Sequence, residues 1–386
     1  MNPNNDTPSI RFAGFTDAWE QRKLGELCSI TTGRLDANAM IDGGKYDFYT
    51  SGVEKYRIDV AAFEGPAITI AGNGANVGYL HLADGKFNAY QRTYVLTDFQ
   101  ADRQFLSSVI GQALPLKIQE EVRGSGIPYI VMDMLTELSV PLPKEGEQSK
   151  VGQLFKEVDT LITLHQRKYD QLVNIKKSML EKMFPKNGEQ VPEVRFAGFT
   201  DAWEQRKLET ICSISSGANT AHEEDGKYFN LTMGSVSEDG QIMYSLKTNE
   251  TSRLLSKGQL IMPTRDVGKG LIIGRTAYVP EDNRFYAGNC LYILTVNADL
   301  DSKFLSYFIN SNYVRQQFAR VVSGGGQKQI TLTDVSELTI SLPKSEEEQK
   351  QISAIFENLD TLITLHQRKL ERLQNIKKAC LEKMFV

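Results

Sequence analysis

Two long segments of the chain place apolar residues at helical spacing. In the first, Val158, His165, Leu172 and Met179 recur every seven residues, and other apolar residues widen the stripe on both sides. This pattern predicts a helix over about residues 148–184, with a coiled-coil seam and additional packing surface. A helix of this size is about 54 Å long, and it needs a partner along its length to cover the stripe.

The second helical segment, over about residues 349–385, repeats the first, and the ten residues Asp159–Lys168 are identical to Asp360–Lys369. We therefore expect the two helices to pair with each other in antiparallel orientation. The residues expected to form the seam and its partner contacts are Val158, Leu161, His165, Leu172, Leu359, Leu362, His366 and Leu373.

Antiparallel pairing would bring His165 and His366 close together, because each lies near the middle of its helix. The two histidines can be space-filling residues at the edge of the seam. They can also form a buried polar pair that fixes the register of the helices.

The regions before the helices, about residues 25–145 and 209–345, alternate short apolar runs with turn residues, which predicts strands and one helix in each. Three runs correspond in order between the two regions: 67–71 with 260–262, 86–89 with 284–287, and 94–97 with 292–295. The regions thus have one fold used twice, with surfaces that have diverged.

The fourteen residues RFAGFTDAWEQRKL occur at Arg11–Leu24 and again, unchanged, at Arg195–Leu208. A repeat of this length indicates a tandem duplication. Within it, Asp17–Glu20 fits a helix-capping box, and we interpret the only two tryptophans, Trp19 and Trp203, as packing anchors. The second copy follows the first helix directly, so the first copy should lie near the end of the second helix.

We therefore predict an α+β protein in which two pseudo-symmetric α/β domains are separated by two long antiparallel coiled-coil helices. Along the chain, the first domain is expected at residues 1–147 and the first helix at 148–184. The linker with the second domain follows at 185–348, and the second helix at 349–386.

Charge is distributed unevenly along the 386 residues. The formal net charge is −4, which is unusual for an isolated nucleic-acid binder. The ends of the two helical segments are basic, in contrast to the chain as a whole. Asp159–Lys186 and Asp360–Val386 each carry six Lys or Arg against three Asp or Glu.

The four cysteines have no metal-ligand spacing and indicate buried residues in a reducing cytoplasm. No stretch approaches the roughly 18 apolar residues of a membrane span.

The chain lacks common catalytic signatures. It has no GxxxxGK[ST] phosphate loop, no HExxH, no paired CxxC and no Asn/Asp-Pro-Pro-aromatic motif of the amino-methyltransferases. Gly72–Asn76 can be a phosphate-cradling turn or a plain hairpin turn, and we favour the hairpin. We expect no catalytic residue, no metal site and no cofactor in this chain.

The duplicated segments, the LPK…EQ sequences before each helix (Pro143–Gln148 and Pro343–Gln349) and the HQRK…NIKK…LEKMF helices together resemble the specificity subunits of type I restriction–modification systems. The resemblance implies that each variable region is a target recognition domain, which reads one half of a bipartite sequence in double-stranded DNA. It implies that the helices set the spacer, that two methyltransferase subunits dock on the conserved segments to methylate adenine, and that motor-nuclease subunits add restriction. Two readers on one face of B-DNA need a separation of about 34–36 Å, which helices of this length can span.

Base reading by such domains would use polar loop residues, because Asn and Gln pair with adenine and Arg and Lys pair with guanine. The candidates are Asn73, Asn76, Gln91, Arg92, Ser125 and Tyr129 in the first domain, and Arg265, Lys269, Gln327, Lys328 and Gln329 in the second. Each of them can equally be an ordinary solvated residue. Two other functional classes stay open at this point: a non-catalytic two-domain protein-binding scaffold, and a nuclease or methyltransferase with an unrecognised site.

Overall fold

The computed structural model describes residues 7–121, 128–186, 189–266, 272–322 and 328–385. The chain forms two compact units, one of Met1–Arg167 with Gln367–Val386 and the other of Lys168–His366. Each unit therefore combines one variable region with a part of each long helix. The second unit is continuous in sequence, whereas the first is built from both ends of the chain.

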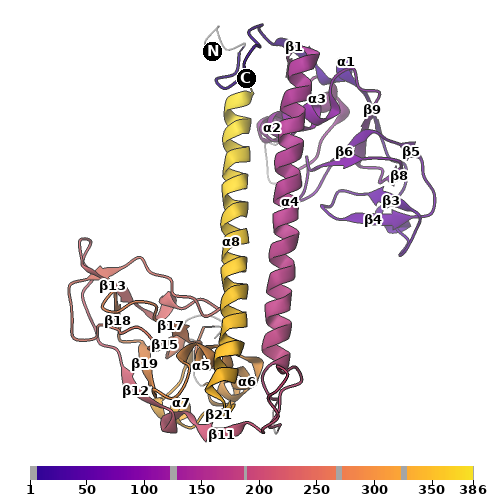
Figure 1. Cartoon of the computed structure of the whole chain (residues 1–386). Coiled ribbons are helices and arrows are strands. Elements are labelled where there is room, and N and C mark those ends of the chain that lie inside the picture. Colours follow the sequence, from indigo (N-terminus) through magenta and orange to yellow (C-terminus); the bar gives the residue numbers. More distant parts are fainter. Residues whose placement is uncertain (1–6, 122–127, 187–188, 267–271, 323–327, 386) are drawn as a thin grey trace. The chain divides into compact units, whose positions relative to one another are not determined.

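The first unit contains two four-stranded sheets, of order β2-β9-β6-β7 and β4-β3-β8-β5, and the strand pair β1-β10. Helix α2 packs on β6 and β7. The elements are β1 (Glu20–Lys23), α1 (Leu24–Leu27), β2 (Ser29–Thr32), η1 (Ala37–Ala39), β3 (Tyr46–Tyr49), β4 (Lys55–Ile58), β5 (Phe63–Glu64), β6 (Ala67–Ala71), β7 (Leu80–Ala83), β8 (Lys86–Ala89), β9 (Thr93–Thr97), α2 (Arg103–Glu121), α3 (Met132–Thr136), β10 (Ser139–Leu142) and the first part of α4 (Glu145–Lys182). Most of them are labelled in Figure 1.

The second unit repeats this arrangement with a four-stranded sheet of order β12-β19-β15-β17, a three-stranded sheet β14-β13-β18, and the pairs β11-β21 and β16-β20. Its elements are β11 (Glu204–Lys207), η2 (Leu208–Thr210), β12 (Cys212–Ser216), β13 (Tyr228–Leu231), η3 (Met233–Ser235), β14 (Lys247–Thr248), β15 (Leu260–Pro263), β16 (Arg265–Asp266), β17 (Ala277–Tyr278), β18 (Phe285–Ala287), β19 (Leu291–Val296), α5 (Ser302–Ile309), α6 (Asn312–Val321), β20 (Lys328–Gln329), α7 (Leu332–Ser336), β21 (Thr339–Leu342) and the first part of α8 (Glu346–Met384).

The strand correspondences predicted from sequence are confirmed. Strand β6 pairs with β9 as β15 pairs with β19, and β8 and β18 lie parallel to β3 and β13 respectively. The single helix predicted for each region is correct in place but incomplete. In the second unit it is divided into α5 and α6 at Asn310–Ser311, and each unit carries a further short helix, α3 or α7, before its last strand.

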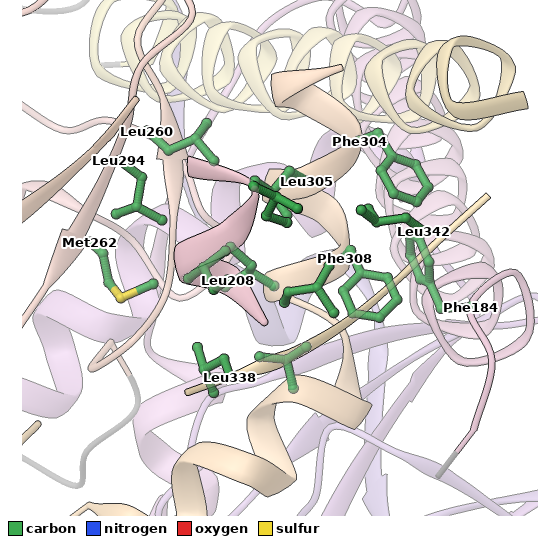
Figure 2. Packing of buried hydrophobic residues seen from close by; sticks show 14 of the residues in the cluster. Phe184, Leu208, Leu260, Met262, Leu294, Phe304, Leu305, Phe308, Leu338 and Leu342 are labelled. Carbon is green, nitrogen blue, oxygen red and sulfur yellow. The ribbon is translucent and has the colours of Figure 1, made fainter. Parts of the chain in front are cut away.

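The core of the second unit encloses Phe184, which follows the end of α4. Its ring stacks on Phe356 of α8 with centroids 5.8 Å apart and meets Trp203 edge-on at 6.4 Å. Figure 2 shows Phe184 beside Phe304 and Phe308 of α5, with leucines of the strands completing the cluster. Trp203 is 1% exposed and Trp19 is 3% exposed, so both tryptophans are packing anchors as predicted.

The same packing occurs in the first unit around Phe385. Its ring lies 5.6 Å from that of Phe155 in α4 and 6.1 Å from that of Trp19. The backbone amide of Ile10 also donates to the carbonyl of Lys383 at 2.9 Å. The first copy of the repeated segment therefore does lie at the end of the second helix, as the sequence predicts.

Within each unit the segments of α4 and α8 run antiparallel. In the first unit, Phe155 and Asp159 face Phe385 and Lys377 in reverse order. In the second, Lys176 and Phe184 likewise face Asp360 and Phe356. The two ion pairs are pseudo-equivalent, since the same residue types join the two helices at matching positions.

The helix beginnings are tied to the repeated segment by a buried acid. Arg11 donates two hydrogen bonds to Glu147, at 2.7 and 2.8 Å, and the indole of Trp19 donates a third at 3.2 Å. In the second unit Glu348 accepts the same three hydrogen bonds from Arg195 and Trp203, at 2.6, 2.9 and 3.3 Å. The EQ pair at the start of each long helix is Glu147–Gln148 or Glu348–Gln349. Its glutamate accepts hydrogen bonds from the arginine and the tryptophan of the repeated segment.

The glutamine of the EQ pair joins three elements. The side chain of Gln148 donates to the carbonyl of Pro143 at 2.7 Å and accepts from the amide of Asp102 at 2.9 Å. Asp102 in turn accepts from the amide of Phe105 in the first turn of α2, at 2.8 Å. Gln349 makes the corresponding contacts in the second unit. These residues form a constant frame that holds β10 or β21, the domain helix and the long helix together.

The helix-capping box predicted at Asp17–Glu20 is wrong. Glu20 begins strand β1, which pairs antiparallel with β10 so that Glu20 lies opposite Leu142. Asp17 forms an exposed ion pair with Lys144 instead. The capping signal is local, and it is overridden here by strand pairing with a segment more than a hundred residues away.

Two of the cysteines, Cys28 and Cys212, are buried, and burial raises the pKa of each thiol to about 12. Cys290 and Cys380 are partly buried. Among the described residues, no helix is long and apolar enough to cross a membrane.

The two pseudo-equivalent ion pairs should contribute unequally to stability. The side chains of Lys176 and Asp360 are 12% and 18% exposed, whereas those of Lys377 and Asp159 are 34% and 51% exposed. Asp360 also accepts from the hydroxyl of Tyr307 at 2.8 Å, and burial, followed by this carboxylate, raises the pKa of Tyr307. We expect Lys176→Met to lower the free energy of unfolding of the second unit by about 1.5–3 kcal/mol. Lys377→Met should cost the first unit less than about 1 kcal/mol. Urea unfolding of both variants measures this, and equal losses would contradict it.

Candidate nucleic-acid interface

The described candidates of the first unit converge at one end of strands β6 and β9. Asn73 and Asn76 lie in the turn between β6 and β7, Gln91 and Arg92 precede β9, and Tyr129 follows α2. Backbone hydrogen bonds join the three segments. The amide of Gly72 donates to the carbonyl of Arg92 at 2.8 Å, and the amide of Ile130 donates to the carbonyl of Gly72 at 2.8 Å.

The turn holding Asn73 is a hairpin turn between β6 and β7, as favoured from the sequence. The amide of Gly78 donates to the carbonyl of Ala71 at 2.8 Å and closes it. Gly72 is required at its start, because a Cβ there would lie 2.3 Å from the carbonyl oxygen of Arg92. The next residue, Asn73, lies directly opposite Tyr129 in an antiparallel bridge, beside which the amide of Gly74 donates to the carbonyl of Pro128 at 3.1 Å.

These side chains are open to a ligand. Tyr129 is 60% exposed, Asn76, Gln91 and Arg92 are exposed, and Asn73 is partly exposed. Behind them, the buried hydroxyl of Tyr94 donates to the carbonyl of Ile130 at 2.8 Å and fixes the segment that carries Tyr129. Burial raises the pKa of Tyr94, so the hydroxyl keeps its proton at neutral pH. Ser125 lies outside the described residues.

The second unit presents a corresponding edge with different side chains. Strand β16 pairs with β20, so that Arg265 lies opposite Gln329 and Asp266 opposite Lys328. The amide of Ile330 donates to the carbonyl of Thr264 at 3.0 Å, as that of Ile130 does to Gly72. By this register Arg265 takes the place of Asn73, and Gln329 takes the place of Tyr129.

We name these two edges the reading edges: Asn73 with Tyr129 in the first unit, and Arg265 with Gln329 in the second. Arg265 and Gln329 are exposed, and Lys328 is partly exposed. Lys269 and Gln327 lie outside the described residues. The structure therefore brings together the described candidates of each unit, and whether they contact bases stays a prediction.

Sequence reasoning missed two residues beside the first reading edge. The hydroxyl of Ser51 donates to Oδ1 of Asn73 at 2.6 Å, and Nε2 of His81 lies 3.3 Å from the carbonyl of Gly52. Neither belongs to a recognisable motif. They reach the edge only because β3 and β7, from different sheets, meet there.

In the second unit, burial marks two arginines that the sequence did not single out. Arg275 donates to the carbonyl of Asn310 at 2.8 Å, and Arg315 donates to the carbonyl of Ile273. Burial, with the charge of Arg275 adding to it, lowers the pKa of Arg315 to about 10. Both arginines still carry their charge at neutral pH and add positive potential to this unit.

The predicted seam of the helices is only partly buried. Val158, Leu172 and Leu359 are buried, and His165, His366 and Leu373 are partly buried. Leu161 and Leu362 are 43% and 42% exposed, so they lie at the open side of the stripe, and their role in partner contacts stays a prediction. The apolar stripe is wider than one partner helix can cover. The proximity of His165 and His366 stays a prediction.

In the ranges that the structure describes, no group of three or more His, Cys, Asp or Glu is placed to hold a metal ion. The buried acids already described, Glu147 and Glu348, are engaged by arginine and tryptophan. What each unit offers is an exposed polar edge on a constant frame, which suits recognition of a partner by its hydrogen-bonding groups.

The chain is similar to known proteins over most of its length. The family model for the type I restriction modification DNA specificity domain matches residues 16–174 and again residues 200–375. The EcoDI specificity subunit of a type I restriction enzyme from Escherichia coli is 24% identical over 95% of this chain and 88% of its own length. The MjaVIII specificity subunit from Methanocaldococcus jannaschii is 22% identical over 93% of this chain and 90% of its own.

Among solved structures, the S subunit of a type I restriction–modification system from M. genitalium has the same fold. It superposes with a TM-score of 0.69 at 18% identity, over 98% of this chain and 99% of that one. The family model accounts for most of the chain in two successive copies, one for each variable region with the helix that follows it. The chain therefore belongs to the family of type I restriction–modification DNA specificity proteins.

Proposed function

We propose that this chain is the DNA-recognition subunit of a type I restriction–modification complex, with each unit reading one half of a bipartite site. The observation that carries the proposal is the pair of reading edges. They occupy equivalent places on the same backbone frame, yet one presents Asn73 and Tyr129 and the other Arg265 and Gln329. Arginine suits guanine and asparagine suits adenine, so two such edges would select two different half-sites.

The chain itself is non-catalytic in this proposal, and it supplies specificity to partner subunits. Two methyltransferase subunits dock on the repeated helical segments, and motor-nuclease subunits join the complex in the cytoplasm. Support comes from exposed apolar residues that recur at identical places: Leu161 and Leu164 in one helix, at 43% and 59% exposure, and Leu362 and Leu365 in the other, at 42% and 43%. An exposed apolar surface present twice on the same sequence fits one kind of partner that binds twice.

The partner subunits also account for the charge of the chain. DNA binding draws much of its affinity from cations placed against phosphates, and a chain with net charge −4 supplies few in excess. In the complex, the other subunits would hold much of the phosphate backbone while this chain reads bases. The long helices, 38 and 39 residues in α4 and α8, would then set the spacer between half-sites.

Mapping of methylated adenines across the genome, in cells with and without this gene, tests the proposal. We expect a bipartite motif, with two defined halves and a fixed spacer, that disappears when the gene is deleted and returns with it. Unchanged methylation in the deletion strain would overturn the proposal. A partner complex that forms but retains no DNA at any salt concentration would instead favour the protein-binding scaffold.

A further inference from the structure

The carboxamide of Asn73 in the first reading edge has a fixed orientation. The hydroxyl of Ser51 donates to its Oδ1 at 2.6 Å. Ser51 follows strand β3, which belongs to the sheet β4-β3-β8-β5, whereas Asn73 follows β6 of the sheet β2-β9-β6-β7. The hydrogen bond therefore joins the two sheets of the first unit at the reading edge.

Ser51 is itself held in place by its neighbours. The carbonyl of Gly52 can only accept, so Nε2 of His81, 3.3 Å away, carries the proton of this hydrogen bond. Tyr49 and Tyr79 enclose the imidazole, with ring centroids 5.1 and 4.8 Å from it. Burial lowers the pKa of His81, so the ring is neutral at pH 7. His81 therefore holds the backbone next to Ser51, and Ser51 in turn holds the Asn73 carboxamide.

An asparagine that reads adenine in the major groove uses both ends of its carboxamide, accepting from N6 and donating to N7. In this structure Ser51 occupies one acceptor site of Oδ1. The Nδ2 end keeps its two donor hydrogens. The second lone pair of Oδ1 also stays available. A carboxamide held in this way therefore presents one acceptor and one donor in a fixed orientation, which is the combination that N6 and N7 of adenine require.

We propose that Ser51 is a positioning residue that sets the base preference at the nucleotide read by Asn73. This inference rests on the proposed function and concerns the first half-site only. The strand register places Met233 in the second unit where Ser51 stands in the first, since Tyr49 lies opposite Ala89 as Leu231 lies opposite Ala287. Methionine has no hydroxyl to donate, so the two halves are expected to respond differently to changes at this place.

The test uses the full chain assembled with its methyltransferase partners and a library of DNA targets randomised in both half-sites. We expect Ser51→Ala to reduce discrimination at one position of the first half-site about 2- to 10-fold, the range of one hydrogen bond. The second half-site should be unchanged. Ser139→Ala is the matched control, because its hydroxyl donates to the side-chain oxygen of Gln21 at 2.8 Å in the distant β1-β10 pair. It should leave every position as in the wild type.

Asn73→Ala should remove the preference at the same position, and adding Ser51→Ala to it should change nothing further. The inference is overturned if Ser51→Ala lowers methylation uniformly while preferences stay as in the wild type, which is the result of a purely structural role. It is also overturned if Asn73→Ala alters no position. In both cases the wild-type bipartite motif survives, whereas failure of the proposed function would leave the wild-type complex without any motif that depends on this chain.

Discussion

Exchanging residues 25–138 for the corresponding region of another family member is expected to replace one half of the recognised sequence completely. The other half and the spacer should stay as they were. The reason is that the two cut points lie next to each other: the amide of Leu24 donates to the carbonyl of Leu138 at 2.9 Å, and β1 and β10 pair immediately beside them. The exchange carries the whole first reading edge and leaves Trp19 and Glu147 in place.

Methylated-adenine sequencing of cells that carry the chimaera measures the result. The reciprocal exchange of residues 209–338 is the control and should change the opposite half-site, because Leu208 and Leu338 form the same hydrogen bond at 2.9 Å. A change in both halves from either exchange, or a new spacer length, would show that the units do not read DNA independently.

Glu147→Gln should destabilise the first unit by about 3–5 kcal/mol, the cost of breaking a buried ion pair. The Glu147 side chain is 1% exposed and that of Arg11 is 13% exposed, so water cannot replace the lost charge. A glutamine side chain offers one oxygen, and its amide nitrogen would face a guanidinium that only donates. At roughly 2–4 °C per kcal/mol for a unit of this size, the melting transition should fall by about 6–20 °C.

Scanning calorimetry of the whole chain separates this effect from a general loss of stability. Glu145→Gln, in the same helical turn but exposed, is the matched control and should leave the transition within about 1–2 °C. Glu348→Gln should lower the transition of the second unit, since Arg195 and Trp203 hold that acid in the same way. A first transition unmoved by Glu147→Gln would mean that the buried acid is not what fixes the repeated segment.

Periodicity and repetition made much of this fold predictable. The long helices were expected over about 148–184 and 349–385, and they extend over Glu145–Lys182 and Glu346–Met384. Their signal is local and sustained, so it survives any tertiary context. The matched strands could be aligned because two copies of one fold carry the same apolar runs in the same order.

The errors arose where distant segments decide local structure. Asp17–Glu20 has the residues of a helix cap, but pairing with β10 makes Glu20 part of a strand.

The candidate site shows the same limit. Polar residues in loops could be named from sequence, and the described candidates do gather at two edges. Their support could not be foreseen, because Ser51 reaches Asn73, and His81 reaches Gly52, only where the two sheets meet. Nothing in the residues around position 51 marks it as different from any serine after a strand.

The first unit is built from two segments that are far apart in the sequence, and this affects the order in which the units can fold during synthesis. Domains usually fold in the order in which the ribosome releases them, with the N-terminal one first. Here the core of the N-terminal unit contains Met384 and Phe385, so that unit stays incomplete until these two residues have been synthesised. The continuous second unit, Lys168–His366, can close earlier. A chain truncated before Met384 would carry one complete reader and one incomplete one, so two-part specificity depends on synthesis having passed Phe385.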